Sequence, residues 1–392
     1  MTDVLVPKVL LSDPARFGGV ALGGMLCGTP ILDGDRIAGL APPRGGPARI
    51  VLPRLIEAHC HLDKCHSAHR LGHIGGDLTT AIERQHADKV NWTRDDLTAR
   101  ATRGLTEARA AGCAVVRSHV DWGDGPEAPL AWHVLPDCVP DGVTLQCAAL
   151  TGVRSWADPA FAKPVADLMA RDRGVLGAFV FDQPGMRDGL HAIFDNATRL
   201  GLPLDFHVDE GLGDLNGLEA IADAALAVGF EGPILCGHAV SLMNRDGDDL
   251  ARITDKLLAA RIAICALPTT NLYLQGRTDG TPDRRGITRL RELRAAGVPI
   301  VVASDNVSDA FCPTGAHDPM AALNLAVLGA HLDPPLEQWL PAITTDAASA
   351  LGVDPAWIDT VPLDHLMAYE TERCADIVAG RAVRRPAVEG LA

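Results

Sequence analysis

The stretch Ile56-Glu57-Ala58-His59-Cys60-His61-Leu62-Asp63-Lys64 follows an apolar run that begins at Ile50, and it places two histidines two positions apart. In an extended strand, residues two apart point to the same side. His59 and His61 can therefore direct two imidazoles toward one point, as a metal ion requires. Because an isolated pair of this kind occurs more often without a metal, the pair indicates a metal site only if later strands add ligands.

The composition of the 392-residue chain excludes several classes of protein. Hydrophobic residues make up 47%, enough for a large core, and the formal net charge is −15 without a Lys/Arg cluster, which argues against a nucleic-acid partner. No apolar stretch reaches the roughly 18 residues of a membrane helix, and the N-terminus lacks the pattern of a signal peptide. The ten cysteines have no Cys-x-x-Cys spacing and predict reduced thiols of a cytoplasmic protein.

From residue 53 onward, short β-rich apolar segments alternate with Ala/Leu/Arg-rich stretches whose apolar residues lie three and four apart. We expect the strands near residues 55–59, 114–120, 144–150, 175–181, 203–208, 233–238, 261–267 and 299–305. Such alternation predicts parallel βα units, and eight units in about 250 residues predict a (β/α)₈ TIM-like barrel.

Both ends of the chain contain short apolar pieces broken by glycine and proline. Residues 1–52 predict short antiparallel strands joined by turns. Ala375 to Arg384 returns to β-like residues that could pair with the N-terminal strands. We therefore expect a barrel over residues 53–359 and a small β-sandwich domain built from residues 1–52 and 360–392.

Polar side chains recur at the predicted strand ends, where the catalytic groups of a barrel lie. They are His59 and His61, His119 and Asp121, His207 with Asp209 and Glu210, His238, and Asp305 with Asn306. One such histidine would ordinarily be a hydrogen-bonded core residue, but residues of this kind on five strands predict one shared site.

Four of these residues form a plausible set of metal ligands. The three imidazoles and one carboxylate of His59, His61, His207 and Asp305 suit Zn²⁺ or Fe²⁺, with a coordination position left for water. The metal would lower the pKa of that water and create hydroxide near neutral pH. Two-metal barrels use a lysine at the end of the fourth strand, which residues 175–181 lack, so we expect a single ion.

Several motifs carry a resemblance to a known family. They are His59-Cys60-His61-Leu62-Asp63, Arg117-Ser118-His119-Val120-Asp121, His207-Val208-Asp209-Glu210, Gly237-His238, and a long stretch from Asn271-Leu272-Tyr273-Leu274-Gln275-Gly276-Arg277 through Arg284–Arg289 to Ser304-Asp305-Asn306. On these residues the chain resembles the cytosine deaminase branch of the amidohydrolase superfamily over nearly its whole length. The resemblance implies a small-molecule substrate and a possible homo-oligomer.

The resemblance also implies a hydrolytic deamination, in which hydroxide generated at the metal attacks the amino-bearing ring carbon and ammonia leaves. Glu210 would move a proton from the water to the adjacent ring nitrogen. His238 would hydrogen-bond the hydroxide or the tetrahedral centre. Asp305 would also accept the second water proton. His119 and Asp121 would support the ligands from behind.

Departures from the family pattern concern the substrate. Cytosine deaminases carry a glutamine where Thr151 stands, a second aspartate at Asn306 and a tryptophan at Phe311. Lys64 instead resembles relatives that remove amines from triazine rings; it would contact a carbonyl or anionic group, or else serve as a structural ion-pair partner. Gln275 follows the seventh strand near the mouth of the site and is a further candidate contact. We therefore expect an amino-bearing N-heterocycle or cyclic amidine other than cytosine.

Two other functions stay open at this stage. The same site could hydrolyse a cyclic amide, a lactam or an N-alkylamine, and ammonia release would separate these reactions from deamination. A non-catalytic assembly protein of the same superfamily is a more remote alternative, because the chain retains every proposed ligand and Glu210. The sequence identifies neither the ring nor the choice between zinc and iron.

Overall fold

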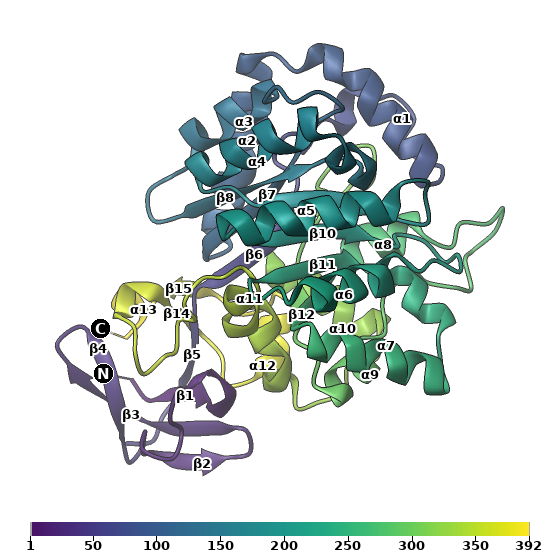
Figure 1. Cartoon of the computed structure of the whole chain (residues 1–392). Coiled ribbons are helices and arrows are strands. Elements are labelled where there is room, and N and C mark those ends of the chain that lie inside the picture. The colour runs from purple at the N-terminus through teal and green to yellow at the C-terminus, as the bar shows by residue number, and fades with distance from the viewer. Residues whose placement is uncertain (1, 392) are drawn as a thin grey trace.

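Parallel strands at the centre of the molecule carry the predicted site residues at their ends. The computed structural model describes residues 2–391 and has mixed α/β structure with parallel sheets (Figure 1). Within these residues, eight parallel strands are β6 (Leu55–Cys60), β7 (Cys113–Asp121), β8 (Thr144–Leu150), β9 (Leu176–Val180), β10 (Leu204–Val208), β11 (Ile234–His238), β12 (Ile262–Ala266) and β13 (Ile300–Val302). Each lies within three residues of its predicted boundaries.

These strands belong to two hydrogen-bonded sheets that meet at both edges. One sheet has the order β6-β7-β8, and the other has the order β9-β10-β11-β12-β13. Parallel bridges join β8 to the start of β9, between Ala148 and Val175, and join Cys60 of β6 to Asp305 just after β13. The strands therefore return on themselves, and all their carboxyl ends face the same side.

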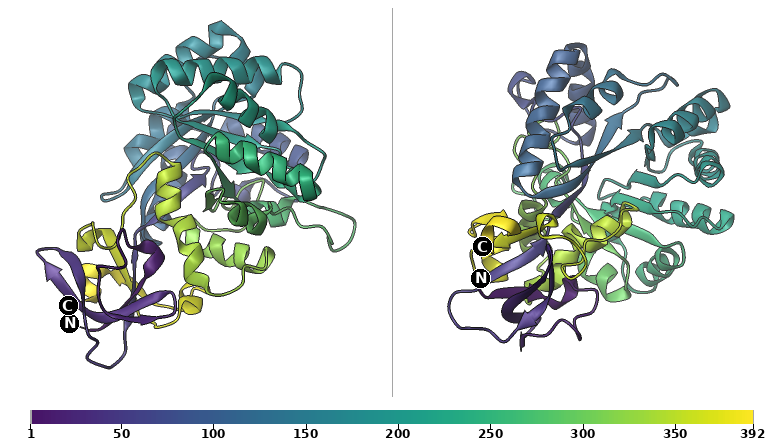
Figure 2. Two further views of the ribbon diagram at one scale, coloured as in Figure 1. Left: turned by 60° about the horizontal axis from the view of Figure 1, so that its bottom comes forward. Right: turned by 90° about the vertical axis from the view of Figure 1, so that its left-hand side faces the viewer.

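Helices cover the outside of these strands (Figure 2). They are α2 (Arg94–Ala110), α4 (Pro159–Asp172), α5 (Met186–Leu200), α6 (Gly217–Val228), α7 (Gly247–Ala259), α9 (Leu290–Ala296), α10 (Pro319–Gly329) and α11 (Thr345–Ala350). Helix α5 is typical: it buries Leu190, Ile193, Phe194 and Ala197, spaced three and four apart. It ends at Gly201, whose φ of 65° is a left-handed C-cap that glycine adopts without strain.

Three further helices lie in the connections between strands. They are α1 (Leu78–Asp88), α3 (Leu130–Val134) and α8 (Pro268–Leu274). Helix α1 belongs to the long segment between β6 and β7. No helix among residues 2–391 combines the length and the apolar character needed to cross a bilayer. All ten cysteines in this part of the chain are unpaired, as predicted.

A third sheet combines strands from both ends of the chain. Its strands are β1 (Val4–Pro7), β2 (Val20–Leu22), β3 (Met25–Asp33), β4 (Arg36–Ala41), β5 (Arg49–Pro53), β14 (Leu366–Tyr369) and β15 (Arg384–Pro386). Strand β14 pairs antiparallel with β5, so a C-terminal strand does join the N-terminal ones, although it lies before the segment that was expected to do so. Figure 1 shows the purple and yellow ends of the chain side by side.

The prediction of a β-like segment from Ala375 to Arg384 is wrong for most of its length. Residues Cys374–Val378 form helix α12, and the strands lie on either side of it; a last short helix, α13, spans Ala387–Gly390. In α12 the side chains of Cys374, Ile377 and Val378 are buried. Their spacing of three and four residues gives this segment one apolar helical face, which outweighs the strand preference of its valine and isoleucine.

Candidate metal and catalytic site

The carboxyl ends of the parallel strands surround a cavity of about 620 Å³. Ten of the predicted site residues line it: His61, Lys64, Asp121, Thr151, His207, Glu210, His238, Asp305, Asn306 and Phe311. The side chain of His59 is fully buried beneath this surface, as is that of His119. The structure thus brings the strand-end residues into one place, as their positions in the sequence predict.

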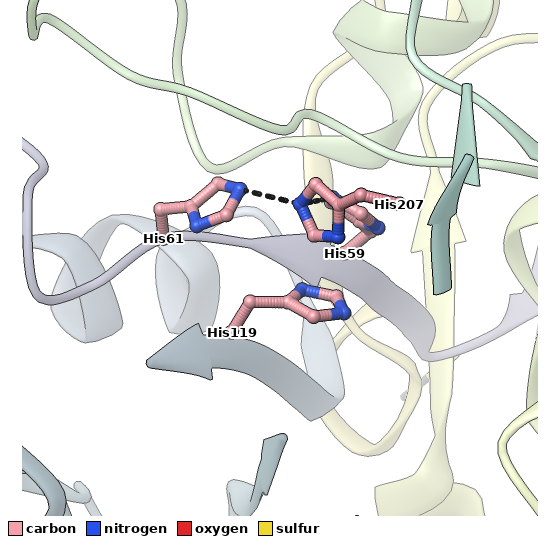
Figure 3. A group of neighbouring side chains, drawn as sticks. All are labelled: His59, His61, His119 and His207. Atoms are coloured by element: carbon pink, nitrogen blue, oxygen red, sulfur yellow. Dashed lines mark hydrogen bonds between the residues drawn. The ribbon is translucent and has the colours of Figure 1, made fainter. Parts of the chain in front are cut away.

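The centre of the site is a cluster of imidazoles from three strands. His59 and His61 lie at the end of β6, His207 lies on β10, and His119 lies on β7 (Figure 3). Nε2 of His207 is 3.1 Å from Nε2 of His59 and 3.2 Å from Nε2 of His61. One nitrogen from each of the four rings lies within 4.8 Å of the others.

Asp305 completes this cluster with a carboxylate. Its Oδ1 is 3.2 Å from Nε2 of His61 and 3.6 Å from Nε2 of His59. Two ligands at about 2.05 Å from one tetrahedral ion are about 3.3 Å apart. The distances from His59 and His61 to His207 and to Asp305 lie close to that value, which suits a single divalent ion held by these residues.

The protonation states of the cluster also suit a metal. Burial and the neighbouring imidazoles hold the pKa of His59 and of His207 well below the usual value, so both rings stay neutral with a free lone pair. Within residues 2–391, neither carboxylate oxygen of Asp305 has a hydrogen-bond partner. A buried carboxylate without partners is costly, and a cation would satisfy it.

His119 lies under the cluster and rests on a buried ion pair. Its Nε2 is 3.1 Å from Oδ1 of Asp205, while Oδ2 of Asp205 accepts from the guanidinium of Arg117 at 2.9 Å. All three side chains are fully buried. Asp205 was missed from the sequence, although its position two residues before His207 places it on the same side of β10.

Two further supports of His59 were also missed. The carboxylate of Glu57 accepts from the backbone N–H groups of Ser304 at 3.1 Å and His59 at 3.4 Å, so it ties β6 to the segment before Asp305. Gly237 makes room for the His59 ring, since a Cβ there would lie 2.8 Å from its Cε1. A charged residue inside an otherwise apolar strand was the available signal for Glu57.

Glu210 and His238 face each other across the floor of the cavity. Oε2 of Glu210 is 3.4 Å from Nε2 of His238. Burial and the nearby Asp305 raise the pKa of Glu210 well above its usual value, while burial lowers the pKa of His238 to about 4. Nδ1 of His238 lies 3.0 Å from the amide nitrogen of Asn271, which fixes the ring. Asn271 belongs to a motif quoted above, where no role was assigned to it.

Lys64 forms an ion pair in the cavity wall. Its Nζ is 2.8 Å from Oδ1 of Asp121, and the other oxygen of Asp121 is 3.1 Å from Nζ of Lys89. Lys64 also lies over the ring of Phe311, 5.0 Å from its centroid. Although burial acts to lower it, the pKa of Lys64 is raised by Asp121 and Asp63. Lys64 is therefore a charged wall residue that combines both expected arrangements, a position at the cavity and an ion pair.

The remaining candidate contacts occupy different places. The hydroxyl of Thr151 lines the cavity and donates to the carbonyl of Gly123 at 2.8 Å. Asn306 lines it too, and its amide donates to Asp309 at 2.6 Å. Gln275 lies behind the cavity surface and donates to the backbone carbonyl of Glu210 at 3.1 Å. The structure thus places Gln275 where it positions Glu210.

An aromatic pair at the cavity mouth was not singled out from the sequence. The rings of Phe179 and Phe181 stack with an interplanar angle of 7° and a centroid distance of 6.2 Å. Their exposed fractions are 40% and 42%, and both line the cavity. The i, i+2 spacing of two phenylalanines at the end of a strand was the signal that could have found them.

Comparison with known proteins places these features in a family. A profile of the amidohydrolase family matches residues 149–356. The pterin deaminase of Rhizobium rhizogenes is 33% identical over 367 residues, which cover 90% of this chain and 83% of that protein. The structure of 5-methylcytosine deaminase from Klebsiella pneumoniae, liganded with phosphonocytosine, is 26% identical with a TM-score of 0.75, and the match covers 89% of each chain.

A third relative shares the fold at lower identity. The atrazine chlorohydrolase from Arthrobacter aurescens, complexed with zinc, is 18% identical with a TM-score of 0.66, and the match covers 99% of this chain and 90% of that one. The histidine cluster, the strand-end motifs and these similarities lead to the same conclusion. The chain belongs to the amidohydrolase family, in its cytosine deaminase-like branch.

Proposed function

We propose that this protein is a metal-dependent hydrolytic deaminase of an amino-substituted N-heterocycle or cyclic amidine. The observation that carries the proposal is the spacing of 3.1–3.6 Å that separates the donor atoms of His59 and His61 from those of His207 and Asp305. The ring of His238 lies 5.1 Å from that of His207, and Glu210 is 3.4 Å from His238. Relatives whose names describe deaminases of a pterin and of 5-methylcytosine support the same reaction class.

The metal centre in this proposal consists of one Zn²⁺ or Fe²⁺ ion held by His59, His61, His207 and Asp305. When bound, the ion supplies Lewis acidity that makes water a nucleophile near neutral pH. His119 acts from below, since its link to Asp205 fixes the ring against His59, with 4.0 Å between their centroids. Asp121 supports the wall through Lys64.

The side chains around the metal centre divide the proton transfers. Glu210, whose pKa is raised by burial and by Asp305, carries a proton from the attacking water to the ring nitrogen next to the amino-bearing carbon. Asp305 accepts the second proton of that water and passes it to the departing amine, which leaves as ammonia. His238, held by Asn271, donates a hydrogen bond to the oxygen where negative charge develops.

The cavity favours a substrate larger than one pyrimidine ring. Its volume of about 620 Å³ lies in the middle of the range for drug-sized ligands, and the Phe179–Phe181 pair offers a face for stacking. Thr151 cannot make the paired amide contact of a glutamine, so cytosine itself is disfavoured. We propose that Lys64, Asn306 and Phe311 contact the ring substituents. Gln275, in contrast, positions Glu210.

The architecture in this proposal is a (β/α)₈ barrel that carries a small β-sandwich domain. The closed set of parallel strands and the sheet shared by β5 and β14 support it. The boundaries at residues 52/53 and 359/360 and an oligomeric assembly stay predictions.

The decisive experiment measures ammonia release by protein reconstituted with Zn²⁺ or Fe²⁺. The substrate panel comprises cytosine, isocytosine, guanine-like and pterin rings, amino-triazines and cyclic guanidines. The matched control is Glu210→Gln, which keeps the size of the side chain and removes its proton transfer. We expect turnover of at least one bicyclic or substituted ring, with kcat reduced about 10²- to 10⁴-fold in the control.

Two outcomes would contradict parts of the proposal. Cytosine turnover with kcat/KM near 10⁵ M⁻¹s⁻¹ or above would overturn the substrate assignment. Absence of ammonia across the panel, while one equivalent of metal binds at the His59 cluster, would overturn deamination. Hydrolysis of a cyclic amide, a lactam or an N-alkylamine would then become the leading function.

A further inference from the structure

A second group of metal-binding side chains lies behind the cavity wall. It consists of Cys65, His66 and His317, which we call the Cys65 cluster, and one donor atom from each lies within 4.8 Å of the others. Cys65 is fully buried, and His66 and His317 are 6% and 1% exposed. None of these three residues belongs to the cavity lining or to the site proposed above.

The Cys65 cluster connects three separate segments. Cys65 and His66 follow His61 in the connection after β6, and His317 lies just before α10, in the connection after β13 that begins at Asp305. Helix α2 forms the third side, because the thiol of Cys65 lies 3.5 Å from the carbonyl of Arg100. Gly104 of α2 leaves room for the His317 ring, since a Cβ there would lie 2.9 Å from its Nε2.

The imidazole of His317 has unsatisfied polar atoms. Neither of its ring nitrogens has a hydrogen-bond partner among residues 2–391. Leaving such a group buried and unpaired destabilises the folded protein. An apolar side chain would pack better at this position. The presence of an imidazole here, beside a thiol and a second imidazole, therefore indicates that the ring binds a metal ion.

The geometry of His66 is also typical of a metal ligand. Its Nε2 lies 3.2 Å from a carboxylate oxygen of Glu107, and neither ring nitrogen makes a hydrogen bond within the described residues. A histidine that binds a metal through one nitrogen commonly donates the other N–H to a carboxylate. Its backbone has a left-handed φ of 58° and is held by a hydrogen bond to Val307 at 3.0 Å.

We infer that Cys65, His66 and His317 bind a second, structural Zn²⁺ ion, with Glu107 orienting His66. A thiolate and two imidazoles are the donors that zinc prefers, whereas Mg²⁺ and Ca²⁺ prefer oxygen. Binding converts the thiol of Cys65 to a thiolate and releases its proton to solvent. The ion links the connections that follow His61 and Asp305, and it thereby fixes two ligands of the catalytic site from outside.

Cobalt binding separates the two sites, because only the Cys65 cluster contributes a thiolate. Protein stripped of metal and reloaded with Co²⁺ alone is expected to bind two equivalents and to show thiolate-to-cobalt charge-transfer absorption in the near ultraviolet. Cys65→Ser and His317→Gln should each lose this absorption and one equivalent of cobalt. Cys374→Ser, a buried cysteine in α12, is the matched control and should keep both.

The same measurement distinguishes this inference from the proposed function. His207→Ala should lose the equivalent at the catalytic site and keep the charge-transfer absorption. Binding of one equivalent by the wild-type protein without that absorption would overturn the inference, and this result needs no variant to fold. Absorption that persists in Cys65→Ser would overturn it as well. Neither readout depends on ammonia release.

Discussion

The floor and the rim of the cavity are built in different ways. The floor, formed by His61, His207, Glu210, His238 and Asp305, lies at strand ends. His61 is 3.2 Å from both His207 and Asp305, and Glu210 is 3.4 Å from His238. The rim, formed by Ile82, Lys89, Phe179 and Phe181, is much more open, with Ile82 exposed to 51%. In the proposed reaction, the floor with its buried contacts would determine the chemistry, and the exposed rim would determine which ring enters.

The largest effect should come from the buried support beneath the floor. Arg117→Met removes the partner of Asp205, which leaves an uncompensated charge next to His119. Breaking a buried pair in this way costs about 3–5 kcal/mol, so urea unfolding should show a loss of that size.

The matched control is Lys163→Met, which breaks an exposed pair with Asp167 on α4. Exposed pairs contribute about 0–1 kcal/mol, and unfolding of this variant should barely change. Equal losses in the Arg117 and Lys163 variants would show that the floor has no special support.

A floor residue should affect the rate and leave binding unchanged. His238→Asn removes the hydrogen bond proposed for the developing negative charge, and kcat should fall about 10²- to 10³-fold at constant KM. Steady-state ammonia release gives both constants, and metal analysis should show unchanged content. A variant that loses metal instead would reassign His238 to the ligand set.

The pH dependence of stability should identify the buried carboxyl group of Asp309, which accepts a hydrogen bond from Asn306. Burial raises the pKa of Asp309 from 3.8 to about 7, against hydrogen bonds from Asn306 and Phe311 that act to lower it. A raised pKa means that the folded protein holds this proton more tightly than the unfolded chain. The contribution of the Asp309 carboxyl group to the free energy of unfolding is greatest below pH 4 and decreases as the pH rises to about 7.

Asp309→Asn removes this titration while keeping the shape of the side chain. The wild type should therefore lose stability relative to the variant, by up to about 1.4 kcal/mol per pH unit between pH 5 and 7. Denaturant unfolding at several pH values measures the difference. A difference that stays constant over this range would show that Asp309 is ionised throughout.

The smallest effect should come from the rim. Phe181→Ala removes part of the face on which we propose that the substrate ring stacks. An aromatic stack contributes about 0.5–1.5 kcal/mol, so KM should rise about 2- to 10-fold with kcat unchanged. Leu328→Ala, at an exposed leucine of α10, is the control and should change neither constant. A large fall in kcat on loss of Phe181 would move this ring from the rim into the reacting geometry.

The same contrast explains how much of the molecule could be predicted. The alternation of two patterns located the parallel strands within three residues. A buried strand is a short continuous apolar run, whereas an amphipathic helix spaces its apolar residues three and four positions apart. The histidines and Asp305 were found because carboxyl ends of parallel strands meet on one side. The Cys374–Val378 helix was assigned incorrectly, because its short apolar pattern also fits a strand.

Contacts between distant segments could not be predicted in this way. The partners of Asp205 lie on β7, and Glu57 reaches Ser304 just beyond β13. No spacing within one strand reveals that such distant residues will meet. The place of Gln275 behind the cavity depends on how the connection after β12 folds. The position of Lys64 at the cavity was predicted, but its simultaneous contacts with Asp121 and Phe311 required the three-dimensional arrangement.

The pairing of β5 with β14 has a consequence for how the protein is made. Strand β14 follows all the parallel strands in the chain. During synthesis, β5 therefore lacks this partner until the central strands have left the ribosome. Contacts between such distant segments slow folding, and an unpaired strand edge is prone to aggregation in the meantime. The sheet built from both ends should thus assemble last. A chain stalled on the ribosome before β14 would expose the unpaired edge of β5, which is prone to aggregation.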